Sequence, residues 1–408
     1  MQVLHPVCCG IDVHSAQLTA CLRRVNDDGQ ITTELVDCGT TYRALIAFRT
    51  WLQEQQCPVV AIESTGVYWK PVYHVLSEAI EVCVAKSQDV RQRPGKKTDE
   101  SDATWIAELL APGLITPSFV PPPEIRALRD LTRTRVSLVQ TRTQAKNRVY
   151  KILEDTNIKL ASVVSDVFGK SARRMLEALV AGERDAAKLS AMALGSLRRK
   201  IPQLEVALEG QFTAHHATLI AGALELVDVL GRQIGELDQQ LQALLGPMAP
   251  PLEQLDSIPG VNEITARDIL AEIGLDMTRF GSVERLAAWA GVSPGNNESA
   301  GKRRKGRTRR GNRYLRRVLV QCAWTTRKTS TFLGRTFRRL KARVGGKKAA
   351  MAVAHKILVI IYHLLLEGTF YEEERYDRLL PRQEERERQR ALKALERLGY
   401  AVTLAKVA

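Results

Sequence analysis

Short apolar runs alternate with polar turns over the first 110 residues, and this pattern predicts strands interspersed with helices. Between the second and third runs, Asn26-Asp27-Asp28-Gly29 supplies the residues of a tight turn. Other segments place apolar residues three and four apart, as Leu45, Phe48 and Leu52 do, and these segments predict helices. The predicted strands are 7–13, 17–25, 31–38, 58–62 and 80–85, and the predicted helices are 41–55, 67–79 and 99–110. The amino-terminal part is therefore expected to be an α/β domain.

The rest of the chain has almost only helical spacing, interrupted by proline-rich segments at 117–123 and 246–251. A long basic helix is predicted from about 124 to 152, and its apolar stripe is only partial, so we expect it to pair with another helix or another chain. A heptad-like apolar seam follows, formed by Leu230, Ile234, Leu237, Leu241 and Leu244. These features predict a helical, coiled-coil middle region that dimerises or acts as a spacer, followed by a mostly helical C-terminal domain.

Four carboxylates stand at the ends of predicted elements of the α/β domain. Asp12 lies at the end of the first strand and Glu63 directly follows the fourth, while Asp99 and Asp102 open the last helix. Three strands in hairpin succession, then helix, strand, helix, strand, helix, is the order of the ribonuclease-H-like fold, in which the first and fourth strands are neighbours. Since Asp99 and Asp102 share one helical face, all four acids are expected to converge and to bind Mg²⁺ or Mn²⁺ for phosphoryl transfer. The alternative for Asp99 or Asp102 taken alone is helix capping or a favourable position in the helix dipole.

Positive charge is in excess and is concentrated towards the C-terminal end. Lys and Arg number 60 against 45 Asp and Glu, which gives a net charge of +15. Between residues 301 and 350 we count 19 Lys and Arg and no acidic residue. A block of one sign this large indicates a nucleic-acid partner.

The cysteines and the apolar segments indicate a cytoplasmic protein. The seven cysteines form no C-x-x-C pair and lie mostly in apolar runs, so we expect buried, reduced thiols rather than disulfides or zinc ligands. No signal-peptide pattern opens the chain, and the apolar run 357–366 is too short to cross a membrane. We therefore expect no membrane partner.

Three motifs carry a resemblance to a known family. GIDVH at 10–14, AIESTGVYW at 61–69 and GKKTDESDA at 95–103 resemble, in this order, the DEDD transposases of the bacterial insertion-sequence-110 family. The stretch that begins IPGVNEITARDILAEIG and continues to ESAGKRRKGRTRRGNRYLRR is similar to that family's second signature domain. The resemblance covers almost the whole chain except the helical middle and the tail.

The resemblance implies a domain organisation and an activity. It implies a RuvC-like DEDD catalytic domain at 1–115, a coiled-coil dimerisation region at 120–250, a transposase domain at 251–370 and a charged helical tail at 371–408. It further implies a bacterial, nucleoid-associated recombinase that is guided by a structured bridge RNA, which pairs with donor and target DNA. The implied assembly is a dimer that forms a tetramer on DNA, and each active site joins the four acids of one subunit to a serine of another.

Ser299 is the serine that the resemblance assigns as the nucleophile, through a 5′-phosphoserine link to DNA. It stands in a small-residue loop that lets DNA come close, and the cations that follow it can neutralise phosphate charge. Without the resemblance, Ser299 would be interpreted as a solvated loop residue. Ser293 and Ser257 are the other serines nearby, and a turn or a cap explains each of them better. The family often has consecutive glycines after the serine, where this chain has Ala300 and Gly301.

Nucleic-acid contacts are expected from basic residues around both sites and from one glycine. Ile258-Pro259-Gly260-Val261 resembles the turn of a helix-hairpin-helix element, whose glycine lets backbone N–H groups approach a phosphate. Tyr68 and Trp69 fit base stacking and core packing equally well, and His14 is interpreted as a strand-end residue rather than a ligand. The residues expected at nucleic acid are Lys96, Lys97, Gly260, Lys302, Arg303, Arg304, Arg307, Arg309, Arg310, Arg313 and Arg316.

Two alternatives to a serine recombinase follow from the same residues. A RuvC-type endonuclease or junction resolvase would use metal-activated water. Ser299 would then have no role in the reaction, and the Ser299→Ala variant would still cut DNA. In a nucleic-acid-binding protein with an inactive nuclease fold, binding of nucleic acid would survive both Asp12→Ala and Asp102→Ala.

Overall fold

The computed structural model divides into two compact units, Met1–Val120 and Pro121–Ala408, and each is described on its own. The described residues are 3–26, 28–64, 66–85, 90, 98–293, 298–299, 302–303, 311–377, 389, 392, 395–397 and 399–400.

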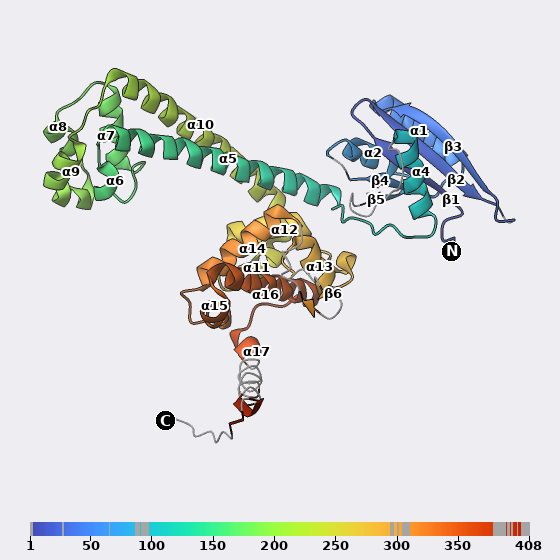
Figure 1. The fold of residues 1–408 in the computed structure, drawn as a ribbon. Helices are drawn as coiled ribbons and strands as arrows, with labels where there is room; N and C mark the ends of the chain where they lie inside the picture. The colour runs from blue at the N-terminus through green and yellow to red at the C-terminus, as the bar shows by residue number, and fades with distance from the viewer. Residues whose placement is uncertain are drawn as a thin grey trace. The chain divides into compact units, whose positions relative to one another are not determined.

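One five-stranded sheet organises the first unit, in the strand order β3-β2-β1-β4-β5 (Figure 1). The strands are β1 (Val7–Val13), β2 (Gln17–Val25), β3 (Ile31–Gly39), β4 (Val59–Glu63) and β5 (Glu81–Ala85). The first three pair antiparallel, whereas β4 is parallel to both β1 and β5. All five predicted strands are confirmed to within one residue at each end, and the mixed sheet is consistent with a ribonuclease-H-like domain.

Helices cover both faces of this sheet. Helices α1 (Tyr42–Glu54) and α2 (Trp69–Leu76) pack on the face that carries Ile11 and Ile62. Helix α4 (Asp99–Leu110) packs on the opposite face, against Cys8 and other side chains of alternate strand positions. Helix α2 is shorter than the predicted 67–79. Residues 66–68 are exposed and form a turn before it, and the buried side chains of the helix are Val72, Val75 and Leu76.

Gly10 is required where α4 crosses β1. A Cβ at this position would lie 2.2 Å from the Ala103 carbonyl oxygen and 2.4 Å from the Ala107 nitrogen. Helix backbone atoms cannot give way as a flexible side chain could. The glycine therefore allows α4 to lie directly on the strand, two residues before Asp12.

Replacing Gly10 by alanine is accordingly expected to destabilise the first unit by about 3 kcal/mol, because the methyl group forces α4 away from the sheet. Denaturant unfolding of the whole chain measures this free energy. Gly39→Ala is the matched control on the same sheet, since a Cβ there meets nothing closer than 3.7 Å. Equal stability of the two variants would contradict the close approach of α4.

A helical arm begins the second unit (Figure 1). Two long helices, α5 (Pro123–Asp155) and α10 (Ala214–Leu245), lie side by side. Their far ends are joined by a compact apolar cluster of short elements. These are α6 (Leu160–Val163), α7 (Lys170–Val180), α8 (Ala186–Ser190), the 3₁₀ turn Gly195–Lys200 and α9 (Ile201–Leu208). The predicted pairing of the basic helix with another helix is thus met within the chain, by α10.

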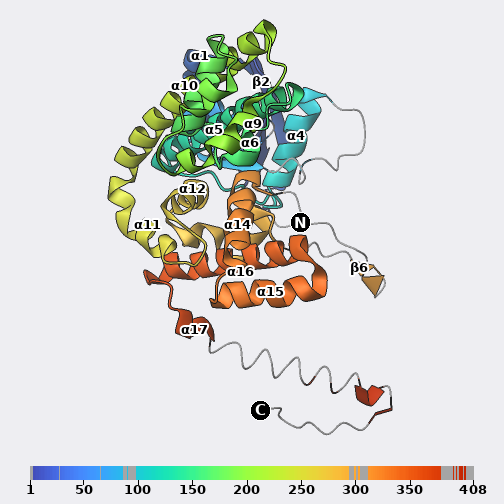
Figure 2. The same ribbon diagram turned by 90° about the vertical axis from the view of Figure 1, so that its left-hand side faces the viewer.

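The C-terminal part of the second unit is mostly helical, as predicted. Its main elements are α11 (Ala249–Asp256), α12 (Glu263–Ile273), α13 (Val283–Ala290), α14 (Arg313–Thr326), α15 (Phe332–Val344), α16 (Gly346–Glu367) and α17 (Glu373–Asp377), with 3₁₀ turns Gly246–Met248 and Met277–Phe280. A two-residue hairpin, β6 (Glu298–Ser299) and β7 (Lys302–Arg303), lies between α13 and α14. Figure 2 shows α14, α15 and α16 grouped together below the arm helices.

Helix α16 is the core of this part. It is the one helix among the described residues that is long and apolar enough to cross a membrane. The apolar run recognised in the sequence is thus part of a longer helix. However, α16 packs against both α14 and α15, and its buried side chains include Val353, Ile357 and Ile361. Burial within the protein accounts for its apolar character.

Candidate functional site

Asp12 and Glu63 lie at the same end of two neighbouring parallel strands. The β1–β4 ladder pairs Gly10 with Ala61 and Ile11 with Ile62, so the next step along it brings Asp12 opposite Glu63. Side chains alternate between the faces of a sheet. Because Ile11 and Ile62 belong to the face of α1 and α2, both acids lie on the opposite face, which α4 covers.

The first turn of α4 supplies the other two acids. Thr98 is the N-cap, and its hydroxyl accepts from the Ser101 N–H while the Ser101 hydroxyl accepts from the Thr98 N–H at 2.9 Å. This capping box leaves the Asp99 carboxylate free of a capping role, so the capping alternative for Asp99 is wrong. Asp99 and Asp102 both stand in the first turn, where the helix dipole favours negative charge.

The four acids come close enough to influence one another. Burial raises the pKa of Asp12, and the negative charges of Asp102, Asp99 and Glu63 raise it further, while His14 opposes the shift. The three other acids therefore lie near enough to Asp12 to influence its pKa, whereas joint binding of one cation by all four stays a prediction. The Asp12 side chain is only 14% exposed, so repulsion among these charges is weakly screened by water.

His14 also belongs to this cluster, which the sequence interpretation did not anticipate. Its Nε2 atom lies 3.4 Å from Asp12 Oδ2 and 3.2 Å from Asp99 Oδ1. Asp12, His14 and Asp99 each offer a ligand atom within 4.8 Å of the other two. The available signal was the spacing, because His14 follows Asp12 by two positions, which places both side chains on one face of an extended chain.

The donor set fits a hard divalent cation. Mg²⁺ is bound in proteins by carboxylate oxygens and water, and Mn²⁺ also accepts an imidazole nitrogen. A cation here would compensate the mutual repulsion that raises the pKa of Asp12. Asp12, His14 and Asp99 could hold such an ion between them, while Glu63 and Asp102 stay predicted ligands.

The remaining predicted site residues belong to other elements. Ser299 lies in β6, and Lys302 and Arg303 form β7, with Ser299 opposite Lys302 in the hairpin. Arg313 and Arg316 are in α14, and Arg313 is exposed. Lys96, Lys97, Arg304, Arg307, Arg309 and Arg310 lie outside the described residues.

Gly260 is explained by packing within the C-terminal part. Its φ is +89°, and a Cβ would lie 2.6 Å from the Thr326 side chain and 2.7 Å from the Cys322 carbonyl oxygen. The Thr325 hydroxyl donates to the Gly260 carbonyl at 3.1 Å. The turn between α11 and α12 is thus held against the end of α14, and its contact with a phosphate stays a prediction.

A basic surface adjoins this turn. Trp324, at the end of α14, is 37% exposed, and the Arg327 guanidinium lies 5.9 Å from its ring centre. Exposed cations continue along α15 and into α16: Lys328, Arg338, Lys341, Arg343, Lys347 and Lys348. An exposed aromatic ring among cations is suited to contact with nucleic acid. Of the two aromatic residues considered near the acids, Trp69 packs on the core and Tyr68 is half exposed.

Comparisons with known proteins match both ends of the chain. A transposase family of the DEDD IS110 type matches residues 9–158, which include the four acids and all of α5. The transposase family IS116/IS110/IS902 matches residues 252–337, which include the hairpin and α14.

Individual relatives are similar at moderate identity. The transposase for insertion sequence element IS1328 of Yersinia enterocolitica is 26% identical over 77% of this chain and 86% of its own length. The y4qE protein of Sinorhizobium fredii, which is named as a transposase, is 26% identical over 63% of this chain. An uncharacterised 42 kDa protein of insertion element IS900 from Mycobacterium paratuberculosis is 31% identical over 38% of this chain. The matches span only 55% and 39% of the last two relatives.

Proposed function

Because this chain belongs to the IS110 family of transposases, we propose that it cuts and rejoins DNA to move an insertion sequence. The observation that carries the proposal is the placement of three acids from β4 and α4, Glu63, Asp99 and Asp102, near enough to Asp12 in β1 to raise its pKa. Acidic clusters of this kind bind the divalent cations used in phosphoryl transfer.

Asp12, Glu63, Asp99 and Asp102 would hold Mg²⁺ or Mn²⁺. When bound, the cation would stabilise the negative charge that develops on the phosphate oxygens during displacement. The protein contributes a fixed arrangement of carboxylates, because Asp12 and Glu63 stand on a sheet and Asp99 and Asp102 on a helix that packs directly upon it. His14 would orient Asp12 and Asp99 through the contacts that it makes with both carboxylates.

Ser299 would be the nucleophile. Its hydroxyl oxygen would form a bond to phosphorus as the P–O3′ bond breaks, so a 3′-hydroxyl leaves and the 5′-phosphate stays on the protein. A carboxylate of the acidic cluster would accept the serine proton, since a neutral hydroxyl is a weak nucleophile, and would return a proton to the departing 3′ oxygen. Rejoining is the reverse attack by a 3′-hydroxyl on the phosphoserine. Phosphodiester energy is conserved in the link, so no ATP is required, and the sequence contains no Walker-type loop.

The basic surfaces would bind nucleic acid, and a structured bridge RNA would guide the choice of DNA. Support comes from the cations that gather on α14, α15 and α16. We propose a dimer in solution and a tetramer on DNA, in which the serine of one subunit meets the acids of another. Sequencing of RNA that copurifies with the protein tests the guide: one structured species is expected, and a random mixture of cellular RNA would contradict it.

Removal of metal tests the proposed chemistry directly. With excess EDTA, cleavage of DNA that carries the element ends should fall to background, because the four carboxylates then repel each other and the phosphate. Added Mg²⁺ or Mn²⁺ should restore cleavage, whereas Ca²⁺, which takes more and longer ligand bonds, should support binding better than cutting. DNA affinity is the control, since the basic surfaces need no metal. Undiminished cleavage in EDTA would contradict the metal site.

A further inference from the structure

The segment that carries Ser299 leaves and rejoins the C-terminal part of the protein at one place. Helix α13 ends at Gly291, which has a left-handed backbone with φ of 72°, and α14 begins after its N-cap Asn312. The Asn312 N–H donates to the Trp289 carbonyl at 2.9 Å. Gly311 lies so close to Gly291 that an added Cβ would stand 2.4 Å from the Gly291 nitrogen. The two ends of segment 292–311 are therefore fixed against each other.

The Asn312 side chain connects this place to α12. Its Oδ1 atom accepts from the Tyr314 N–H at 3.0 Å and from the Leu315 N–H at 3.1 Å, as a helix N-cap does. The capping role determines which end of the amide faces α14, so the Nδ2 group is left to donate elsewhere. It donates to the Glu272 carboxylate.

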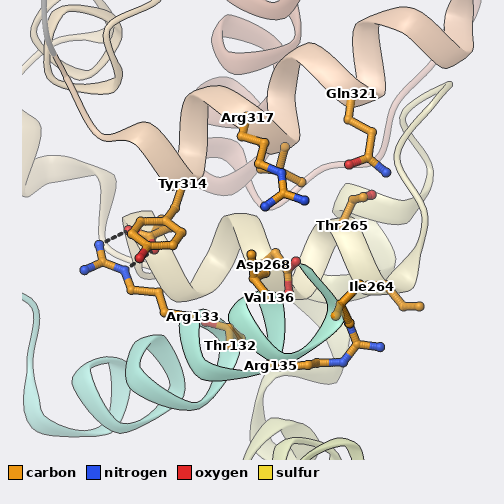
Figure 3. Close-up of a pocket in the computed structure, with 13 residues that line it drawn as sticks. Thr132, Arg133, Arg135, Val136, Ile264, Thr265, Asp268, Tyr314, Arg317 and Gln321 are labelled. Carbon is orange, nitrogen blue, oxygen red and sulfur yellow. Dashed lines mark hydrogen bonds and ion pairs between the residues drawn. The ribbon is translucent and has the colours of Figure 1, made fainter. Parts of the chain in front are cut away.

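Glu272 in turn binds the arm helix α5. Glu272 is 2% exposed, and its carboxylate accepts from Arg133 Nε and Nη2, both at 2.8 Å. Arg129 Nε lies 3.5 Å from the same carboxylate, and burial lowers the pKa of Arg129 to about 10 although Glu272 opposes the shift. The Arg133 guanidinium also lies 4.4 Å from the centre of the Tyr314 ring, beside which Figure 3 draws it. A buried carboxylate with these partners is strongly held, because loss of one partner leaves a buried charge.

Helices α5 and α14 face each other across an open space in this region. A cavity of about 190 Å³ lies between α5, α12 and α14 (Figure 3). A cavity provides none of the close contacts that would hold two helices in one position. The polar contacts around Glu272 connect α5 with the start of α14 beside this cavity.

We propose that Arg133, Glu272 and Asn312 form a relay that transmits the position of the arm helix α5 to the base of the segment that carries Ser299. Glu272 and Asn312 are positioning residues, since neither is placed at DNA. A partner that holds or shifts α5 would thereby change how the hairpin is presented for reaction. The catalytic consequence rests on the proposed role of Ser299, whereas the mechanical connection does not.

An exchange of donor and acceptor tests the relay in the full-length protein with Mg²⁺ and DNA. Asn312→Asp keeps the cap of α14 but places a second carboxylate against Glu272, so formation of the serine–DNA adduct should slow by about tenfold at unchanged DNA affinity. Adding Glu272→Gln relieves the repulsion between the two carboxylates but also removes the charge that Arg133 and Arg129 bind, so the double variant should recover only part of the rate. Arg173→Gln is the matched control, because it breaks an arm ion pair with Asp228 that is remote from Asn312.

Hydrogen exchange of segment 292–311 provides a second readout that needs no chemistry. Exchange should accelerate in Asn312→Asp, return towards the original rate in the double variant and stay unchanged in Arg173→Gln. If the double variant reacts and exchanges like Asn312→Asp, or if Asn312→Asp alters neither quantity, the relay is wrong. If exchange follows the expected order but Ser299→Ala still forms the adduct, the relay holds and the assignment of the nucleophile fails.

Discussion

Replacing Asp12 by asparagine is expected to reduce DNA cleavage by about three orders of magnitude or more while DNA affinity stays within a few-fold of the original. Asparagine has the size of aspartate, so the packing beneath α4 is kept. What is lost is a largely buried negative charge that Glu63, Asp99 and Asp102 influence. Asp102→Asn should behave in the same way, since its carboxylate acts on the same centre from α4.

Glu100→Gln is the matched control for these substitutions. Glu100 lies in the same first turn of α4, between two proposed ligands, yet it is exposed. Its replacement removes one negative charge from the same turn and should leave cleavage nearly unchanged. Gel assays of cleavage and affinity distinguish the cases. An Asp12→Asn protein that cuts at a rate close to the original would refute the metal centre, and loss of affinity together with cleavage would point to misfolding.

The same Asp12→Asn protein should be no less stable than the original in metal-free buffer. Asparagine removes one of four negative charges that repel each other at close range, and this relief offsets the loss of the His14 contact. A functional residue that costs stability is what one expects of a site selected for binding a cation. This pairing of lost activity with retained stability separates a metal ligand from a structural carboxylate.

The sheet and the position of the acids could be predicted because they follow from local pattern. Residues 8–11 are buried without exception, since alternate side chains face α1 and α2 on one side and α4 on the other. Such a strand appears in the sequence as a continuous apolar run, so the acidic residue at its end is easily recognised as a candidate site residue. Strand order then brings Asp12 and Glu63 together, and the three-residue spacing does the same for Asp99 and Asp102.

Contacts between distant polar residues could not be predicted from one sequence. His14 meets Asp99 across 85 positions, and Arg133 meets Glu272 across 139. No regular spacing in the sequence indicates either pair, because each contact depends on how whole elements of the fold pack together. The heptad-like seam has a related ambiguity, since an apolar stripe does not specify its partner. Leu230, Ile234 and Leu241 are buried in the chain, where α10 lies along α5, whereas Leu244 is 41% exposed.

Replacing Ser299 by alanine is expected to abolish the covalent protein–DNA adduct and to reduce strand exchange by about four orders of magnitude or more, because the oxygen that we propose as the nucleophile is removed. Binding of DNA and of divalent cations should persist, since neither the basic helices nor the four acids are altered. Denaturing gels that retain covalent adducts measure the first effect. A strand-exchange assay with labelled element ends measures the second.

The outcome also decides between a serine recombinase and a nuclease that uses water. A hydrolytic nuclease would cut as fast without the Ser299 hydroxyl as with it, because water supplies the attacking oxygen. Ser257 and Ser293 are the controls among nearby serines. The Ser257 hydroxyl donates to the Gln254 carbonyl and accepts from the Tyr371 N–H at 2.9 Å, so Ser257→Ala should lower stability slightly but keep the adduct. If Ser293→Ala rather than Ser299→Ala removes the adduct, the nucleophile lies six residues earlier, and only its position in the loop needs revision.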